Sequence, residues 1–297
     1  MIHIMLDTDI GDDIDDALAL AMILNSDELD LLGVTTVHGE VDIRSQLAAR
    51  ILHVADKGNI PVAAGIGKPF ASEPRLSFIK GQAKILDGIP PYKLDSRDGV
   101  TLLADMARQC AGQLTLVGIG PLTNIALFVK NHSDYLPLLR ELVIMGGNVH
   151  SNSTEYNIAM DPEAAQIVFH SGIPMRVVPF NITESCKMGD TIIEALFADQ
   201  RPLQSIIGQL VDKWQTFCNL TYPVLHDPLA IGCLIAPELY TFESFDVDVV
   251  LTSGRHRGLT IGNRNPASNI RVCTSVDYAT FLDLFCSLLL PISVSVR

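Results

Sequence analysis

Six aspartates crowded between positions 7 and 16 are the residues of this sequence most able to do chemistry. They lie in the segment MLDTDIGDDIDDALAL, as Asp7, Asp9, Asp12, Asp13, Asp15 and Asp16. Two unit charges about 4 Å apart repel by roughly 4 kcal/mol at an effective dielectric constant of about 20. A divalent cation with hard oxygen ligands relieves such repulsion. The cluster therefore predicts a site for a metal ion or a polar substrate.

Carboxylates near the start of a helix can also serve the helix alone. The helix dipole favours them, and they accept hydrogen bonds from N–H groups that lack a partner in the first turn. This role accounts for one or two of the aspartates. It does not account for six acids that follow a first strand, because open α/β sheets bind their ligands at the carboxyl ends of strands. We therefore favour binding over capping as the main role of the cluster.

The tetrapeptide LHDP at positions 225–228 is the second candidate. An Asp-Pro pair often starts a helix, since proline suits the first helical turn. The same pair at Asp161 is interpreted as a cap. Beside Asp227, however, His226 adds a group that can transfer a proton or form a hydrogen bond near neutral pH. A structural and a functional role both stay open for this segment.

Short apolar runs alternate with helical patterns through the first two thirds of the chain, and this alternation sets the expected fold. Strands are predicted at 2–6, 29–37, 60–64, 114–117, 142–145 and 175–179. Helices are predicted at 15–24, 42–55, 99–110, 121–129 and 161–169. Later elements are helical regions at 191–219 and from 227, strands at 245–251, 258–262 and 270–275, and a helix at 278–290. The pattern predicts an α/β fold with a mainly parallel open sheet flanked by helices.

Composition supports one globular domain over residues 1–297, with 48% hydrophobic and 19% charged residues. The net charge of −13 makes nucleic acid and anionic membrane surfaces poor partners. Six scattered cysteines without a CxxC pair indicate reduced thiols. The start MIHIMLD lacks a basic region, and no apolar run approaches the roughly 18–20 residues that span a bilayer. A cytoplasmic location is therefore expected.

Taken together, the segments resemble the inosine/uridine-preferring nucleoside hydrolase family, which consists of nucleoside N-ribohydrolases. The matching pieces occur in family order: DTDIG at 7–11, DDA at 15–17, GVTTV at 33–37, GPLTN at 120–124, MGG at 145–147, EYN at 155–157, DPEAA at 161–165 and HDP at 226–228. The aspartate cluster and HDP are specific pieces, whereas EYN alone would be an ordinary polar loop.

The resemblance implies a Rossmann-like core and a Ca²⁺-dependent hydrolysis of ribonucleosides to free base and ribose. Such a reaction serves purine and pyrimidine salvage or catabolism. It implies one Ca²⁺, bound by the carboxylates of Asp9, Asp16 and Asp227 and by the backbone carbonyl of Ile119. Ribose hydroxyls and a water would complete the six to eight oxygens that calcium takes. Asp9 would also be the general base for the attacking water. A homodimer or homotetramer is a further expectation from the family.

Other residues would hold the nucleoside. Asp15 and Asn157 would bind ribose hydroxyls, and Glu155 would lie toward the 5′-hydroxyl. The leaving base needs a proton or a strong hydrogen bond, because the transition state resembles an oxocarbenium ion. His226 is either that acid or a residue that orients Asp227 or stacks. Trp214, the one tryptophan of the chain, either contacts the base or belongs to the core.

The sequence departs from the family pattern within the aspartate loop. Members usually have Asp-x-Asp-Pro-Gly-x-Asp-Asp, whereas this chain has two extra residues and Ile10 in place of Pro. We align Asp15 and Asp16 with the family pair because both directly open an apolar helix. The roles of Asp12 and Asp13 stay open, and Asp13 is an alternative ligand for ribose or metal.

Glu40 is a second departure, since many relatives have Asn at this place. A carboxylate there adds negative charge, and we expect it near the substrate. It is also the only hint of an alternative, a nucleoside- or sugar-binding protein without catalysis. Another alternative is a phosphatase or phosphotransferase, since Asp-x-Asp after a first strand suits an aspartyl nucleophile with Mg²⁺. That alternative leaves HDP and EYN unexplained.

Overall fold

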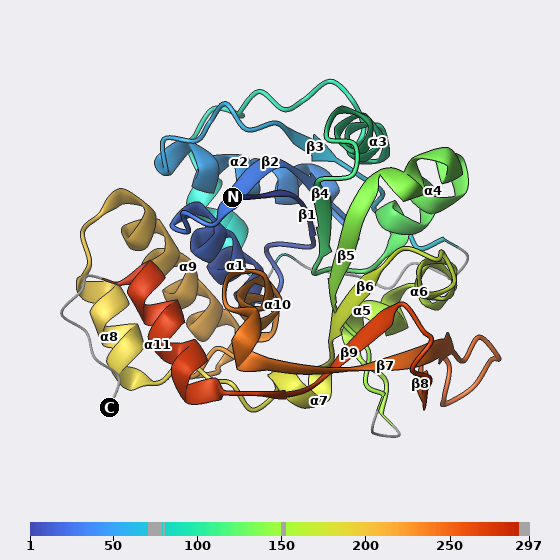
Figure 1. The fold of residues 1–297 in the computed structure, drawn as a ribbon. Coiled ribbons are helices and arrows are strands. Elements are labelled where there is room, and N and C mark those ends of the chain that lie inside the picture. Colours follow the sequence, from blue (N-terminus) through green and yellow to red (C-terminus); the bar gives the residue numbers. More distant parts are fainter. Residues whose placement is uncertain (71–78, 80, 150–152, 291–297) are drawn as a thin grey trace.

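One open sheet runs through the computed structural model, which describes residues 1–70, 79, 81–149 and 153–290 (Figure 1). Its order over these residues is β3-β2-β1-β4-β5-β6-β9-β7-β8. The strands are β1 (Ile2–Thr8), β2 (Leu29–Thr36), β3 (Val62–Ala64), β4 (Leu114–Gly118), β5 (Leu139–Met145), β6 (Met175–Val178), β7 (Tyr240–Val249), β8 (Thr260–Arg264) and β9 (Ile270–Val276). All neighbouring pairs from β3 to β9 are parallel, and β7 and β8 add an antiparallel edge.

Helices cover both faces of this sheet. They are α1 (Asp15–Leu24), α2 (Val41–Val54), α3 (Gly99–Gln109), α4 (Thr123–Asn131), α5 (Tyr156–Met160), α6 (Pro162–Phe169), α7 (Phe180–Thr183), α8 (Asp190–Ala198), α9 (Pro202–Cys218), α10 (His226–Ile235) and α11 (Tyr278–Leu289). In Figure 1, α1, α9, α10 and α11 lie on one side of the sheet, and α3, α4 and α6 on the other. Two apolar cores result, one on each face.

The central position of β1 decides where a ligand can bind. The next strand in sequence, β2, pairs on one side of β1, whereas β4 pairs on the other. The chain therefore changes direction across the sheet between β1 and β4. In open α/β sheets, the crevice at the carboxyl ends of two such strands is the usual binding place.

Helices α1 and α10 are the elements that carry carboxylates to this crevice. Both are apolar apart from their first turns, so both are buried along nearly their whole length. They pack against each other beside the sheet. The acids at their N-terminal ends consequently lie below the protein surface.

The expected single-domain α/β fold is confirmed, and several boundaries differ. The helical region predicted at 191–219 is two helices, because Arg201 is extended and Pro202 starts α9. The predicted strand at 245–251 starts earlier, at Tyr240, and β9 lies between it and β6. The short helices α5 and α7 were not predicted. The sequence at 70–98 is rich in Pro, Lys and Asp and predicts a polar loop; its residues 71–78 and 80 lie outside the described residues, while Gln82–Leu86 forms a 3₁₀ helix.

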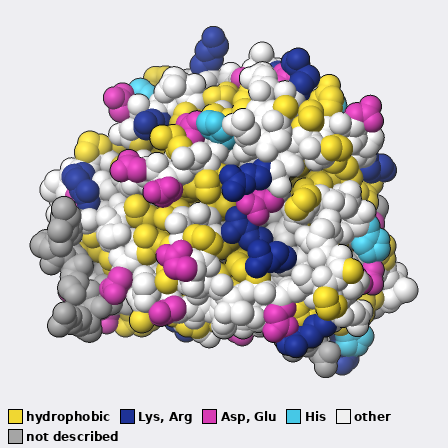
Figure 2. All heavy atoms as spheres, in the orientation of Figure 1, with side chains coloured by type: hydrophobic (Ala, Val, Ile, Leu, Met, Phe, Trp, Pro, Cys, Tyr) yellow, Lys and Arg dark blue, Asp and Glu magenta, His cyan; other side chains and the backbone are white. Residues whose placement is uncertain are grey.

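Surface and thiols agree with the composition. All six cysteines are free, as expected. Within the part of the chain that the structure describes, no helix has the length and apolarity needed to cross a membrane. Acidic side chains are scattered among basic ones on the face shown in Figure 2, so the net negative charge is not gathered into one patch there.

We predict that Gly232→Ala destabilises the fold. A Cβ atom at Gly232 would lie 2.6 Å from Cε2 of Phe281, where α10 meets α11. Overpacking of this kind costs about 1–3 kcal/mol. Urea denaturation should show that loss of unfolding free energy. Gly189→Ala is the matched control, since its Cβ meets nothing within 4 Å. Equal stability of the two variants would contradict the packing seen at Gly232.

Candidate active site

A cavity of about 470 Å³ opens at the carboxyl edge of the sheet. Its walls come from the segments that follow four neighbouring strands, β1, β4, β5 and β6, and from the start of α10. The lining combines the carboxylates of the aspartate loop with the apolar side chains of Met145, Met160 and Phe180. A polar floor beneath an apolar wall suits a small ligand with one hydrophilic and one aromatic part.

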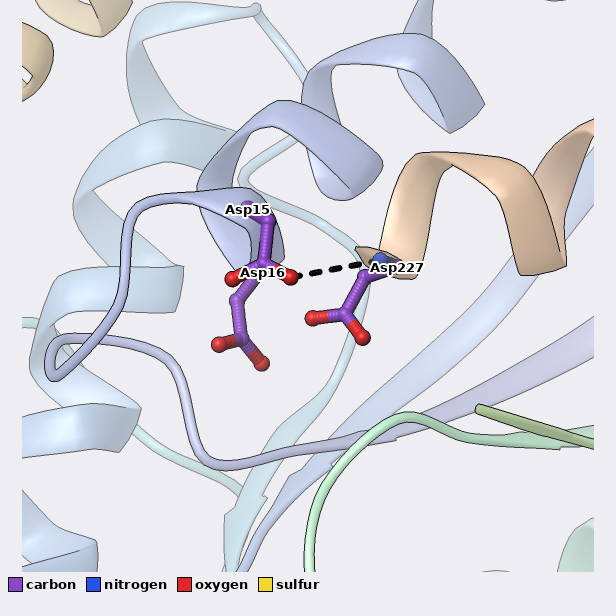
Figure 3. A group of neighbouring side chains, drawn as sticks. All are labelled: Asp15, Asp16 and Asp227. Carbon is purple, nitrogen blue, oxygen red and sulfur yellow. Dashed lines mark hydrogen bonds between the residues drawn. The ribbon is translucent and has the colours of Figure 1, made fainter. Parts of the chain in front are cut away.

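Three carboxylates converge at the floor of this cavity. Oxygens of Asp15, Asp16 and Asp227 all lie within 4.8 Å of one another. Figure 3 shows the three side chains directed toward one another, the first two from α1 and the third from α10. The backbone N–H of Asp227 donates to Oδ2 of Asp15 at 3.3 Å, which joins the two helix starts.

These carboxylates are held where they are costly to ionise. Burial raises the pKa of Asp15, Asp16 and Asp227 well above the usual value, and the neighbouring acids raise each pKa further. A cation among them would offset both effects. Because every donor is a hard oxygen, the group fits a divalent ion such as calcium or magnesium and not one that prefers nitrogen or sulfur. The cluster could therefore bind a metal ion.

Asp9 lines the same cavity but does not belong to the close group of three. It is buried, and burial raises its pKa to about 7, with a further increase from Asp12 and a decrease from Arg44. The sequence predicted Asp9 with Asp16 and Asp227 as the ligand set. In the structure Asp15, expected to bind ribose, takes the third place in the close group.

The EYN segment supplies the opposite wall. The side chain of Asn157 donates from Nδ2 to the carbonyl of Ile119 at 3.0 Å and to that of Met145 at 3.2 Å. Glu155 accepts hydrogen bonds from the backbone N–H groups of Gly147, Asn157 and Ile158, so it caps α5. Both predicted residues and Ile119 thus line the cavity.

His226 also lines the cavity, next to Asp227. Its ring stacks on Phe180, with ring centroids 5.4 Å apart and planes 19° apart. Its Nδ1 is hydrogen-bonded to Oγ1 of Thr183 at 2.6 Å. Burial lowers the pKa of His226 to about 4, so the free protein holds a mainly neutral imidazole at pH 7. The ring is fixed in place, which suits a donor or a stacking group equally well.

Trp214 and Glu40 lie elsewhere, which corrects two expectations. Trp214 belongs to the buried face of α9 in the apolar core, and only 2% of it is exposed. Its indole follows the helical period that faces the core, away from the cavity. Glu40 is exposed at the N-terminus of α2, where the helix dipole favours a carboxylate. Neither side chain lines the cavity.

Several lining residues were not predicted from the sequence. Tyr156, between two predicted residues, is 48% exposed at the cavity wall, and its hydroxyl lies 3.3 Å from Nε2 of His38. Asp12, whose role stayed open, lines the cavity, and so does Asp13, which the sequence offered as an alternative ligand for ribose or metal. Phe180 follows β6 and also lines the cavity. Its position just after a predicted strand was the feature of the sequence that could have placed it in a binding site.

Fold and cavity together define an α/β enzyme whose crevice, at the switch between β1 and β4, presents carboxylates to a small ligand. Residues 4–283 match the model of the inosine-uridine preferring nucleoside hydrolases. The chain belongs to this family and is thus an N-glycosidase that acts on ribonucleosides. The phosphatase and the non-catalytic alternatives are set aside.

Relatives match almost end to end. The pyrimidine-specific ribonucleoside hydrolase RihA of Shewanella baltica is 34% identical over 301 residues, covering 95% of this chain and 94% of that protein. The probable uridine nucleosidase 2 of Arabidopsis thaliana is 34% identical, with coverages of 87% and 84%. Among solved structures, the plant nucleoside hydrolase PpNRh1 has a TM-score of 0.88 at 26% identity, with 97% and 99% of the two chains covered. A purine-preferring ribonucleoside hydrolase from Gardnerella vaginalis has a TM-score of 0.86 at 25% identity, with 97% and 98% covered.

We predict that Gly120→Ala impairs hydrolysis by displacing Asp9. A Cβ there would lie 2.8 Å from Oδ1 of Asp9 and 2.9 Å from its backbone nitrogen. Displacement by about 1 Å can cost about 100-fold in rate, so ribose release should fall by that order. Gly146→Ala is the control at the same sheet edge, because its Cβ would make only ordinary contacts of 3.4 Å and more. Similar activity of the two variants would show that Asp9 needs no such exact placement.

Proposed function

We propose that this chain is a Ca²⁺-dependent hydrolase of pyrimidine ribonucleosides, which it converts to free base and ribose. The convergence of Asp15, Asp16 and Asp227 at the cavity floor is the observation that carries the proposal. Pyrimidine preference is supported by the relatives at 34% identity, one named pyrimidine-specific and one a probable uridine nucleosidase.

Calcium would be held by Asp9, Asp16 and Asp227 with the carbonyl of Ile119, and Asp15 is close enough to share in binding it or ribose. When bound, Ca²⁺ supplies positive charge that offsets the carboxylates and polarises oxygen atoms in the cavity. Asp9 accepts the proton of the attacking water. Its buried place beside other acids favours the protonated form, which makes it a stronger base than an exposed carboxylate.

Ribose would lie between the floor and the EYN segment. Because Nδ2 of Asn157 already donates to two carbonyls, a ribose hydroxyl donates to its Oδ1. Asp15 accepts from another hydroxyl, and Glu155 lies toward the 5′ side. The surrounding carboxylates stabilise the positive charge that develops on the sugar as the bond to the base breaks.

The base would lie against the apolar side of the cavity. Phe180, Met160 and Tyr156 provide that surface. His226, stacked on Phe180, either donates to the departing base or orients Asp227. A neutral leaving base is needed because an anionic one would be repelled by the acidic floor.

The proposal extends to the setting of the enzyme. Family resemblance supports a role in nucleoside salvage or catabolism, one domain over residues 1–297, a homodimer or homotetramer, and a cytoplasmic location. Size-exclusion chromatography with light scattering would measure the assembly.

A panel of ribonucleosides with a ribose assay tests the function directly. Uridine and cytidine should release ribose faster than inosine, and chelation of calcium should abolish release until Ca²⁺ is restored.

The 2′-deoxynucleosides should be hydrolysed more slowly, by up to about 10⁴-fold, since polar groups of a buried site built to bind a hydroxyl are left unpaired. Equal turnover of uridine and deoxyuridine would refute the ribose contacts, and full activity after chelation would refute the metal.

Asp9→Asn and His226→Ala should separate the base from the acid. Asp9→Asn keeps an oxygen for the metal but loses the proton acceptor, so turnover should fall by about 10²- to 10⁴-fold. His226→Ala should impair natural nucleosides while sparing a nitrophenyl riboside, whose leaving group needs little protonation. Near-normal turnover by calcium-loaded Asp9→Asn would assign the base elsewhere. Equal losses on both substrates would reduce His226 to a positioning role.

A further inference from the structure

Arg44 is a fully buried cation beside the aspartate loop. It belongs to α2, and none of its surface is exposed. Its Nε donates to the carbonyl of His38 at 2.7 Å, and its Nη2 donates to Oδ2 of Asp12 at 2.7 Å. Its Nη1 donates to the carbonyl of Ile10 at 3.0 Å and also to that of Asp9. Nη1 and Nη2 therefore bind the aspartate loop that lines the cavity, and Nε binds the segment that follows β2.

These contacts fix the position of the backbone at Asp9 and Ile10. Removing a guanidinium from water is costly unless its hydrogen bonds are satisfied, so the loop and the side chain hold each other in one arrangement. The planar fork of arginine matches several acceptors at fixed angles, whereas the point charge of lysine does not. The arrangement thus depends on geometry as well as on charge.

Arg44 also faces the acids electrostatically. Although burial lowers its pKa, the charges of Asp9, Asp12 and Asp16 outweigh that effect and raise it, so Arg44 stays protonated. It is thus a permanent internal counter-charge for the loop. The negative charge that a bound cation would find in the aspartate loop is therefore already partly neutralised by Arg44.

The same guanidinium reaches the opposite wall through His38. This residue has a φ of 67°, a left-handed conformation that is uncommon for residues other than glycine. The bond from Arg44 to its carbonyl helps to hold that conformation. The ring of His38 in turn meets the hydroxyl of Tyr156 at the cavity wall. One buried cation thus connects the carboxylate floor to the aromatic wall.

We propose that Arg44, paired with Asp12, is the positioning residue of this active site. It sets the place of Asp9 relative to the other carboxylates, and through His38 it supports Tyr156. This inference rests on the proposed function: its kinetic readout needs nucleoside hydrolysis, and its binding readout needs the proposed calcium site.

The experiment compares Arg44→Lys with a matched control, Arg176→Lys. Arg176 is a partly buried arginine with a forked ion pair, to Glu141, and it donates to the carbonyl of Cys233 away from the cavity. Both substitutions keep the charge and lose the fork. Calcium affinity by titration calorimetry, kcat and KM on uridine, and melting temperature would be measured for both.

Arg44→Lys should bind Ca²⁺ about 10- to 100-fold more weakly, the usual effect of losing a group that orients metal ligands. Its kcat should fall by a similar factor, with a smaller change in KM. Arg176→Lys should melt at a lower temperature with calcium affinity and kcat unchanged. Asp12→Asn keeps the shape of the side chain and removes its charge, and it should show the same pattern as Arg44→Lys. If Arg44→Lys does not fold, Asp12→Asn tests the role of the Arg44–Asp12 pair in its place.

A folded Arg44→Lys with calcium affinity and kcat within about twofold of the wild type would overturn the inference, as would the same losses in Arg176→Lys. A wild type that binds calcium but releases no ribose refutes the proposed function alone, because the affinities of the variants still test Arg44. Where ribose is released without calcium binding, the kcat of the variants decides.

Discussion

Crowding of buried carboxylates is the constraint on which this structure depends. Asp15, Asp16 and Asp227 are each costly to ionise because they are desolvated, and neighbouring acids add repulsion. The fold offsets part of that cost with positive charge of its own. The N-terminal ends of α1 and α10 bring helix dipoles to the carboxylates, and Arg44 adds a full charge on the other side of the loop. The negative charge that remains uncompensated, on Asp15, Asp16 and Asp227, suits a divalent cation.

The position of the two helices explains how so polar a floor can be buried at all. Apart from their first turns α1 and α10 are apolar, so the hydrophobic effect drives both into the core beside the sheet. The acids in their first turns are buried with them, because moving either helix end into solvent would also expose the apolar residues of that helix. Burial of the helices thereby stabilises an arrangement that the acids alone would oppose.

Much of the fold was predictable because parallel strands are continuously apolar and are separated by helices with clear starts. The carboxylates, Ile119, the EYN segment and His226 were also predicted to share one site, and they do line one cavity. For Trp214 the core alternative applies, because it shares the buried face of α9 with Ile207, Leu210 and Val211. Arg44 was missed because a basic residue in an amphipathic helix usually faces solvent. Two of its partners are the backbone carbonyls of Asp9 and Ile10, more than thirty residues away, and such contacts leave no trace in sequence spacing.

Asp7 shows why the number of acids does not by itself define a site. It is as buried as the cavity acids, yet its Oδ1 accepts from Oγ1 of Thr35 at 2.6 Å and from Nδ2 of Asn124 at 2.7 Å. Those bonds join β1 to β2 and α4. Burial raises the pKa of Asp7 to about 7, and the two hydrogen bonds limit that increase. Asp16, by contrast, accepts from the hydroxyl of Thr8 and lies close to Asp9 and Asp15, whose charges raise its pKa. An acid supplied with uncharged donors holds the fold together, whereas acids that face one another need a cation. That difference in partners separates the structural aspartate of this segment from the functional ones.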